Sequence, residues 1–411
     1  MMRKSALLLL MLPAQALHVH RGLLRPKDVT VTMQAAEPVV RNLEVASWAS
    51  STNFIEFTID MYGHMLGDQE RTAAFERAIQ RRMSSLPSGA IVLDIGTGPC
   101  AILAVFAARA GATKVYAVEA NAAAAELARA TVAFVQDPST PDHIAPGTIE
   151  VIEGFSTAIT LPERADLLVS EIVGSIASEE GMYTSIRDAR LRHMKRPEDP
   201  RSYIPVRCQT LAVPASYSPH HKLNCNWTAS GPPVRLDCDD PWLRPLSAPQ
   251  FLEDFAFGGA EPPLGPGTHG PLSPLVFTVD AATIDANCGA LEELLLSTGV
   301  PAERATPLAE TMAGSLSGVA CWPRLVLDEG DGLEEKPILI ESRGMLAEPR
   351  PSHWQTVLPL LCSRPAPIQA GEAVIVRPTI KLAKDVETAP RYEICASIEA
   401  QARVRVPGLE I

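Results

Sequence analysis

Two glutamates, Glu171 and Glu180, stand nine residues apart just after a predicted strand, in the segment Ser-Glu-Ile-Val-Gly-Ser-Ile-Ala-Ser-Glu-Glu-Gly-Met that runs from 170 to 182. A carboxylate at the C-terminal end of a parallel strand projects into the crevice where ligands bind, and a second one can return on a loop to face it. Two facing carboxylates repel each other unless a cation lies between them, and a planar, permanently charged guanidinium with five N–H donors fits best. The alternative is that Glu179 and Glu180 are ordinary solvated surface acids.

A second group of residues predicts a nucleotide site. Asp94 lies near the end of the apolar run from 90 to 95, Gly96 and Gly98 follow in a turn, and Glu119 ends the next predicted strand. Glycines let the backbone approach a ligand closely, and the acid on the second strand accepts hydrogen bonds from two ribose hydroxyls. Cys100 stands where the dinucleotide fingerprint has its third glycine.

The sequence Val-Leu-Asp-Ile-Gly-Thr-Gly from 92 to 98 resembles the first motif of the class I S-adenosylmethionine-dependent methyltransferases. In that family the acid and the glycines hold the methionine part of the cofactor, and the acid of the next strand holds the ribose. The resemblance therefore implies S-adenosylmethionine as the cofactor, with Asp94, Gly96, Gly98 and Glu119 around it.

Within that class, the chain is similar to the protein arginine methyltransferases. Glu171, Gly174 and Glu180 match the spacing of their double-glutamate loop. The segment from 62 to 71 resembles their N-terminal helix. In the family, the arginine that corresponds to Arg71 binds the cofactor carboxylate, and the methionine that corresponds to Met65 lies by the transferred methyl group.

A third segment, Ser-His-Trp from 352 to 354, looks like the Thr-His-Trp loop of the family's β-barrel domain. In the family that histidine, here His353, pairs with the helix aspartate, here Asp68. The resemblance also implies that Tyr62 and Trp354 contact the substrate and that Thr157 and Met182 lie by the cofactor. Thr157 stands about where many members carry an acid near the adenine.

The implied reaction is methyl transfer from S-adenosylmethionine to a guanidino nitrogen of arginine in histone or Arg/Gly-rich proteins, with Glu171 and Glu180 clamping the guanidinium. The loop resembles the symmetric-dimethylating branch, whereas Met65, Met182 and His353 resemble the asymmetric or monomethylating branches, so the product stays open. Either the two carboxylates or the His353–Asp68 pair accepts the proton. The alternatives are a class I methyltransferase acting on a small molecule or nucleic acid, and a catalytically silent relative that serves as a binding module.

The elements that must position these residues follow from the hydrophobic pattern. Residues 47–86 have helical spacing, and short apolar strands then alternate with helices, which predicts a Rossmann-like parallel sheet. After residue 205, short strands recur with one helix near 291–296, which predicts an antiparallel β-barrel-like domain. Ten prolines fall between 232 and 274, a density that indicates an inserted loop or arm.

The predicted domains are therefore an extension over 1–46, a cofactor domain over 47–205 and a β-barrel domain over 206–411 with a Pro-rich insertion at 216–275. That insertion is unlike the helical dimerisation arm usual in the family, so a homodimer is left open.

The N-terminus has the layout of a secretory signal peptide. Arg3 and Lys4 precede an apolar run, and small residues at 14 and 16 offer a cleavage site. The basic stretch to about 41 is compatible with an organelle transit segment. The alternative is an unstructured extension of a cytoplasmic or nuclear protein, as in the family. No later stretch predicts a membrane span.

Composition limits the partners. The formal net charge is −12, which argues against a primary grip on nucleic-acid phosphates and suits a cationic partner. The eight cysteines include no Cys-x-x-Cys motif, so we expect no metal site.

Overall fold

The computed structural model describes residues 39–50, 59–221, 231–259, 265–330, 332, 335–343, 352–385 and 387–400. The predicted signal segment over 1–16 lies outside these residues, as does the basic stretch that follows it, except for residues 39–41, which lie in a strand. Within the described part of the chain, none of the helices has both the length and the apolar character needed to cross a bilayer.

The first half of the chain builds a parallel sheet, as the alternating pattern predicts. Its five strands lie in the order β5-β4-β3-β6-β7 and are β3 (Ile91–Ile95), β4 (Lys114–Glu119), β5 (Ile149–Glu153), β6 (Leu167–Ser170) and β7 (Tyr203–Ile204). Every residue of β3 and β6 is buried, which explains their continuous apolar sequences, since both faces of such a sheet are covered.

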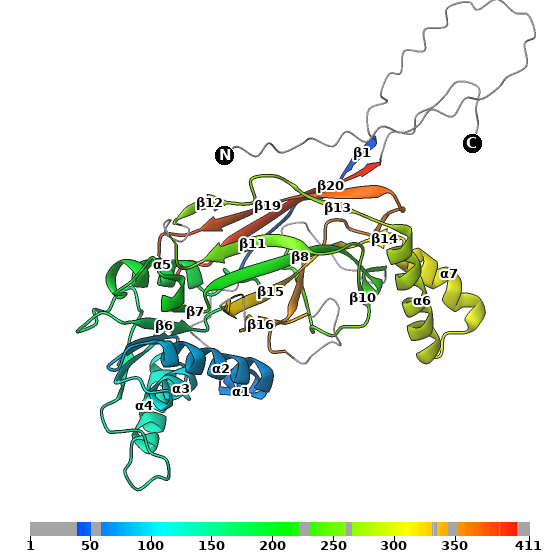
Figure 1. Cartoon of the computed structure of the whole chain (residues 1–411). Helices are drawn as coiled ribbons and strands as arrows, with labels where there is room; N and C mark the ends of the chain where they lie inside the picture. The colour runs from blue at the N-terminus through cyan, green and yellow to red at the C-terminus, as the bar shows by residue number, and fades with distance from the viewer. Residues whose placement is uncertain are drawn as a thin grey trace, which may run out of the picture. The chain divides into compact units, whose positions relative to one another are not determined.

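The helices of this half precede and connect the strands (Figure 1). They are α1 (Ile59–Gly67), α2 (Gln69–Ser85), α3 (Ile102–Arg109), α4 (Ala122–Val135) and α5 (Met182–Arg192). The chain proceeds from β3 through β4 to β5 on one side, then returns to β6 on the other side of β3. Ligands bind at such a switch point, beyond the C-terminal ends of the strands. The turn after β3 and the loop after β6 both lie there.

The second half, together with two strands from residues 39–49, builds two antiparallel sheets. One contains β1 (Val39–Asn42), β2 (Ala46–Ala49), β12 (Gly267–His269), β13 (Leu275–Thr278), β19 (Glu372–Leu382) and β20 (Arg391–Ala400). The other contains β8 (Arg207–Tyr217), β9 (Val234–Leu236), β10 (Leu243–Pro245), β11 (Gln250–Ala256), β15 (Gly318–Asp328), β16 (Ile338–Glu341) and β17 (Thr356–Leu358). A short pair, β14 (Ser315–Leu316) and β18 (Ala366–Pro367), lies beside them. The predicted α/β plus antiparallel β architecture is confirmed.

Two strands lie where the sequence predicts an extension and then a helix. β1 and β2 both pair with β20, so the extension predicted over 1–46 ends before Val39 and the helical region predicted from 47 begins with a strand. Trp48 stacks on Tyr392 with 5.2 Å between the ring centroids. These strands are four residues long and depend on a partner about 350 residues away, which local periodicity does not reveal.

The Pro-rich segment is also different from its prediction. Instead of a separate arm, its described residues supply β9, β10, β11 and β12 to the two antiparallel sheets. Proline lacks a backbone N–H and is tolerated at sheet edges or at the ends of strands. Accordingly, Pro245 lies in β10 at one end of its sheet, and Pro233 directly precedes β9 at the other end.

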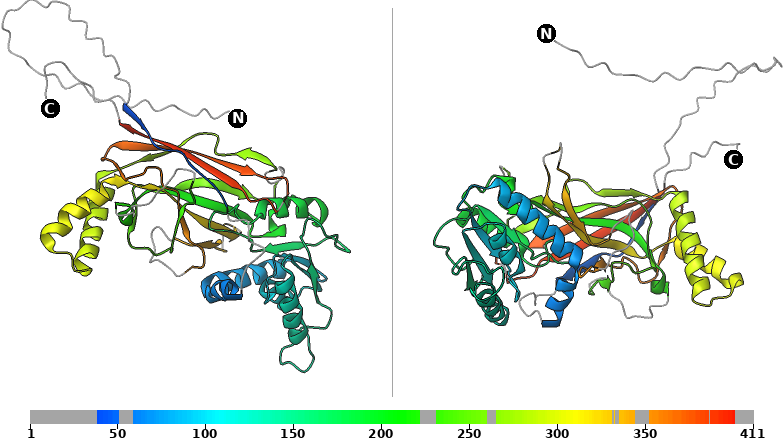
Figure 2. Two further views of the ribbon diagram at one scale, coloured as in Figure 1. Left: turned by 180° about the vertical axis from the view of Figure 1, so that it is seen from behind. Right: turned by 60° about the horizontal axis from the view of Figure 1, so that its bottom comes forward.

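A helical hairpin, α6 (Ala281–Ser297) and α7 (Ala302–Ala313), follows β13. The two helices lie side by side at the margin of the antiparallel strands (Figure 2). They bury a small apolar cluster of their own that includes Leu291, Leu295 and Met312. The sequence predicts only part of α6, and Pro307 inside α7 obscures the second helix.

A buried ion pair joins α2 to β15. Arg82 Nη2 donates to Asp328 Oδ2 at 2.6 Å, and these side chains are only 8% and 4% exposed. Asp328 Oδ1 also accepts from Arg81 Nη1 at 3.3 Å and from the Gly330 amide at 2.7 Å. One carboxylate therefore holds the helix, the strand and the turn that follows it.

We predict that Asp328→Asn lowers the free energy of unfolding by about 3–5 kcal/mol, because it leaves the buried Arg82 cation without its counter-ion. Glu153→Gln is the matched control, since it breaks the solvent-exposed pair with Arg129 and should change the free energy by less than about 1 kcal/mol. Chemical unfolding followed by circular dichroism compares the two. Equal effects would contradict the structural role of the buried pair.

Candidate active site

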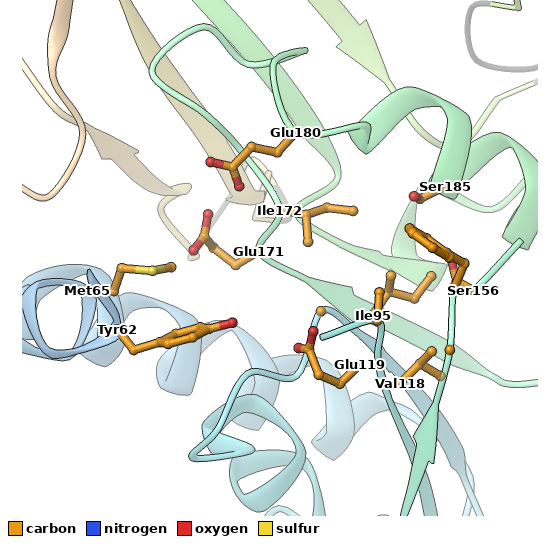
Figure 3. Close-up of a pocket in the computed structure, with 14 residues that line it drawn as sticks. Tyr62, Met65, Ile95, Val118, Glu119, Ser156, Glu171, Ile172, Glu180 and Ser185 are labelled. Atoms are coloured by element: carbon orange, nitrogen blue, oxygen red, sulfur yellow. The ribbon is translucent and has the colours of Figure 1, made fainter. Parts of the chain in front are cut away.

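A cavity opens at the switch point of the parallel sheet (Figure 3). Its walls come from α1, the ends of β3 and β4, the loops after β5 and β6, and the start of α5. The lining residues are Tyr62, Met65, Ile95, Gly96, Val118, Glu119, Ala120, Gly154, Phe155, Ser156, Glu171, Ile172, Glu180 and Ser185. Tyr62, Met65, Gly96, Glu119, Glu171 and Glu180 were all predicted as site residues.

The glycine turn after β3 has a left-handed backbone at Gly96 and Gly98, and at Gly96 a side chain would also collide with a neighbour. Gly96 has φ +76°, and a Cβ there would lie 2.4 Å from Ile172 Cγ2. Gly98 has φ +63°, and its Cβ would lie 3.4 Å from the Tyr62 ring. Both conformations favour glycine. The turn therefore lets α1 and the loop after β6 approach the end of β3 closely.

Glu119 fixes this turn from the neighbouring strand. Its carboxylate accepts from the Gly98 amide and the Asn121 amide, both at 2.8 Å. Burial raises the pKa of Glu119, although these amide bonds oppose the rise. Each carboxylate oxygen has a second lone-pair direction. Glu119 can therefore still accept hydrogen bonds from the hydroxyl groups of a ligand.

Asp94 acts on the same turn from within the sheet. It is fully buried and accepts from Thr97 Oγ1 at 2.6 Å, and burial raises its pKa to about 7. It is absent from the residues that line the described cavities. Its contact to Thr97 makes it a support of the turn.

Arg71 joins the turn side of the site to the double-glutamate loop. Its Nη2 donates to Glu171 Oε2, and both side chains are buried. Among the described residues, its buried Nε has no hydrogen-bond partner. Arg71 lines an adjoining cavity together with Gly96 and Gly98. An anionic group bound there would satisfy the free N–H, which fits the predicted role of Arg71 toward the cofactor carboxylate.

Glu171 and Glu180 face each other on the cavity wall formed by the loop after β6 (Figure 3). Burial, followed by the charges of Glu171 and Glu179, raises the pKa of Glu180 to about 8. The nearby positive charges of Arg71 and Arg235 oppose this rise without cancelling it. The geometry therefore provides two carboxylates and too little positive charge, which suits a cationic ligand.

Glu179, unlike Glu180, is bonded to neighbouring protein groups outside the cavity. It is 4% exposed, accepts from Arg235 Nη2 at 2.6 Å and from the Ile176 amide at 3.1 Å. It does not line the cavity. A Cβ on Gly174 would lie 2.5 Å from Glu179 Cβ, so the loop closes tightly at this point. The alternative of a solvated surface acid is wrong for Glu179.

His353 and Asp68 lie beside this arrangement as a pair. His353 Nδ1 is 3.1 Å from Asp68 Oδ2, and Asp68 also caps α2 by accepting from the Arg71 amide at 3.1 Å. Burial raises the pKa of Asp68, but the hydrogen bonds from His353 and from the Arg71 amide outweigh burial and leave the pKa below its ordinary value. The pair links the Ser-His-Trp loop to the start of α2.

Three other predicted residues lie away from the cavity wall. Trp354 is buried and donates from Nε1 to the Val173 carbonyl at 2.6 Å. Met182 is fully buried at the start of α5. Thr157 lines a neighbouring cavity with residues of α5, whereas Ser156 lines the first one.

Sequence reasoning missed Phe155, Ser156 and Ser185. The first two follow β5 at the same sheet edge as the glycine turn, so the strand order gives a usable signal for them. Ser185 lies in the first turn of α5, a helix that begins after Gly181. Recognising that helix would have placed Ser185 on the cavity wall, where Figure 3 shows it near Ser156.

Comparisons with known proteins agree with this geometry. No protein-family model matches the chain. The chain is 32% identical over 332 residues to the arginine N(omega)-methyltransferase of Streptomyces achromogenes subsp. streptozoticus, covering 76% of this chain and 74% of that protein. It is 38% identical over 158 residues to the protein arginine N-methyltransferase PRMT10 of Arabidopsis thaliana, covering 38% and 37% of the two chains.

Solved structures with the same fold include Arabidopsis thaliana protein arginine methyltransferase 10. That structure matches with a TM-score of 0.59 at 19% identity and covers 86% of this chain and 97% of its own. The Trypanosoma brucei PRMT1 enzyme-prozyme heterotetrameric complex with AdoHcy matches with a TM-score of 0.56 at 19% identity, covering 79% and 88%.

We predict that Gly96→Ala weakens S-adenosylmethionine binding by about 10- to 100-fold, since the methyl group combines left-handed backbone strain with a collision at Ile172. Gly111→Ala is the matched control. Gly111 has φ +100°, but a Cβ there would meet nothing within 4 Å. Isothermal titration calorimetry measures both variants. Wild-type affinity in Gly96→Ala would contradict the assignment of this turn to the cofactor.

Proposed function

The chain belongs to the protein arginine methyltransferase family, and we propose that it transfers a methyl group from S-adenosylmethionine to a guanidino nitrogen of arginine in protein substrates. The observation that carries the proposal is the pair Glu171 and Glu180, facing each other on one cavity wall with too little positive charge beside them. A guanidinium supplies that charge together with a fork of donors.

The clamp addresses the main chemical difficulty. Guanidinium has a pKa above about 12 and is a poor nucleophile because its lone pairs are delocalised. S-adenosylmethionine supplies an electrophilic methyl group on a sulfonium. Glu171 and Glu180 bind two nitrogens of the substrate, localise positive charge there and leave the third more nucleophilic. Positioning of this kind supplies on the order of 7–11 kcal/mol.

The other residues divide between binding and proton transfer. Arg71 binds the cofactor carboxylate, Glu119 binds the ribose, and Tyr62 and Met65 cover the site from α1. Glu180 accepts the proton that methylation releases, because its raised pKa makes it a stronger base than an ordinary carboxylate. His353 holds Asp68 and, through it, the start of the helix that carries Arg71.

A second substrate is favoured by one specific observation. The relative that matches three quarters of its own length is named for arginine and not for protein arginine. If the substrate is a small molecule, this observation favours free L-arginine. Transfer of a labelled methyl group should be measured with an Arg/Gly-rich peptide, a histone, free L-arginine and RNA in parallel. Labelling of RNA alone, or of nothing while the cofactor binds, would refute arginine methylation.

Three further parts of the proposal concern the whole chain. Residues 59–205 form the cofactor domain, and the barrel domain comprises residues 206–400 together with β1 and β2. We also propose that the segment over 1–16 directs targeting and that the protein forms a homodimer. N-terminal sequencing of the protein from its own cells and sedimentation analysis test the last two.

We predict that Glu171→Gln and Glu180→Gln each reduce the rate of arginine methylation by about 10²–10³-fold, since each removes a charge-assisted bond from a desolvated site. Cofactor affinity should persist, because Arg71 remains for the cofactor carboxylate. The double variant should lose less than the sum of the two effects, as for residues that act as a unit.

The control for these variants is Glu126→Gln, at an exposed position on α4. Glu179→Gln is unsuitable as a neutral control, because it breaks the pair with Arg235. Steady-state methylation rates with the peptide substrate compare the clamp variants with this control and with wild type. Wild-type rates in both clamp variants would refute the clamp.

We also predict that kcat/KM for the arginine substrate rises as the pH increases from about 7 to 9. Glu180 is largely neutral below its pKa of about 8 and becomes charged above it, whereas the substrate guanidinium stays protonated throughout. The ionised fraction of Glu180 goes from about one tenth at pH 7 to about nine tenths at pH 9, so the total rise over this range should be about tenfold. In Glu180→Gln the rise should disappear at saturating cofactor. An identical rise in that variant would assign the titration to another group.

A further inference from the structure

The loop that carries the two clamp glutamates is bonded at every second residue to β8 or to the segment just before β17. The Val173 carbonyl accepts from Trp354 Nε1 at 2.6 Å, and Ser175 Oγ accepts from the Gln355 amide at 3.0 Å. Further along, the Ala177 amide donates to Thr210 Oγ1 of β8 at 2.9 Å. The path of the loop between Glu171 and Glu180 is therefore set by the other half of the molecule.

Behind the end of this loop lies a buried acid to which the proposed reaction assigns no role, Glu253 of β11. It is 1% exposed and does not line the cavity. One carboxylate oxygen accepts from Ser178 Oγ and the other from Thr210 Oγ1. Ser178 Oγ is also 2.8 Å from the Tyr392 hydroxyl of β20. The Glu253 side chain thus joins Ser178 of the loop to β11, which carries Glu253, and to β8, which carries Thr210.

The carboxylate decides which way the two hydroxyl groups point. Because an ionised carboxylate only accepts hydrogen bonds, Thr210 must donate its hydrogen to Glu253 and keeps its lone pairs for the Ala177 amide. Ser178 donates to Glu253 in the same way and keeps a lone pair for Tyr392. Burial raises the pKa of Glu253 to about 7, and the two hydroxyl bonds oppose the rise. Above pH 7 the ionised form therefore predominates.

The stability of the fold alone does not explain a buried, ionised carboxylate such as that of Glu253. Burying a carboxylate without a paired cation is unfavourable, and an apolar side chain of similar size is often better tolerated. The arrangement is specific in what it does hold, since Ser178 is anchored by Glu253 and Glu179 by Arg235. These are the two residues that directly precede Glu180.

We propose that Glu253 is a positioning residue of the guanidinium clamp, holding Ser178 and Thr210 so that the loop aims Glu180 at Glu171. The inference rests on the proposed function, in which Glu180 binds the substrate. A displacement of about 1 Å at a reacting group is enough to cost about 100-fold in rate. Loosening this anchor should therefore affect arginine methylation far more than cofactor binding.

The test compares Glu253→Leu with Glu253→Gln in the full-length protein at pH 8.5. The glutamine accepts from Thr210 through its oxygen and donates to Ser178 through its nitrogen, so the loop stays tied. The leucine makes neither bond. Asp254→Asn is the matched control, because this neighbour on β11 bonds instead to Arg207 and Gln209.

Three measurements are made on each variant: hydrogen exchange of the amides in 172–181, kcat/KM for the arginine substrate, and the dissociation constant of S-adenosylmethionine. In Glu253→Leu we expect exchange in the loop to accelerate by about tenfold or more and kcat/KM to fall by about 10- to 100-fold. Its cofactor affinity should stay within about twofold of wild type. Glu253→Gln should stay within about threefold of wild type in all three, and Asp254→Asn should match wild type.

Unchanged loop exchange in Glu253→Leu would overturn the inference, as would a loss of cofactor affinity in proportion to the loss of methylation. If that variant does not fold, Ser178→Ala removes the same contact at the loop end, and wild-type exchange there would equally overturn it. A wild-type protein that methylates no arginine refutes the proposed function instead. The exchange measurement still decides whether Glu253 holds the loop.

Discussion

Buried carboxylates with too few cations are the constraint on which this site depends. Removing a carboxylate from water is costly unless hydrogen bonds or counter-charges replace the lost solvation. Glu119 receives two backbone amides, Glu171 receives Arg71, and Glu179 receives Arg235. Glu180 is left facing Glu171 with a raised pKa. The cavity is thus arranged to be completed by a cation that the ligand brings.

The two halves of the fold contribute differently to this arrangement. The parallel sheet brings Glu119 and Glu171 to one edge, because β4 and β6 lie on either side of β3 and run in the same direction. The path from Glu171 to Glu180 depends on the antiparallel strands, which hold the loop through Trp354, Thr210 and Glu253. The first acid is placed by sheet topology and the second by contacts between the halves.

This division explains how much the sequence reveals. The strands β3, β4, β5 and β6 are predictable because buried parallel strands are short apolar runs, and the glycine turn and the glutamates follow them directly. β1 and β2 are not predictable in this way, since they depend on β20 near the other end of the chain. Glu253 and Arg235 give no local signal either. Each is a single charged residue on a strand whose partner becomes apparent only when the chain folds.

The pair between Arg71 and Glu171 connects the two ligands that the proposed reaction requires. Without ligands, each side chain neutralises the other inside a buried region. In the proposed complex, the cofactor carboxylate lies by Arg71 and the substrate guanidinium by Glu171, so one added anion and one added cation keep the local charge balanced. An anion at Arg71 weakens its hold on Glu171, which makes the carboxylate a better acceptor for the guanidinium. If both ligands bind as proposed, the two binding events would favour each other through one shared ion pair, and by reciprocity each ligand would gain the same factor in affinity from the other.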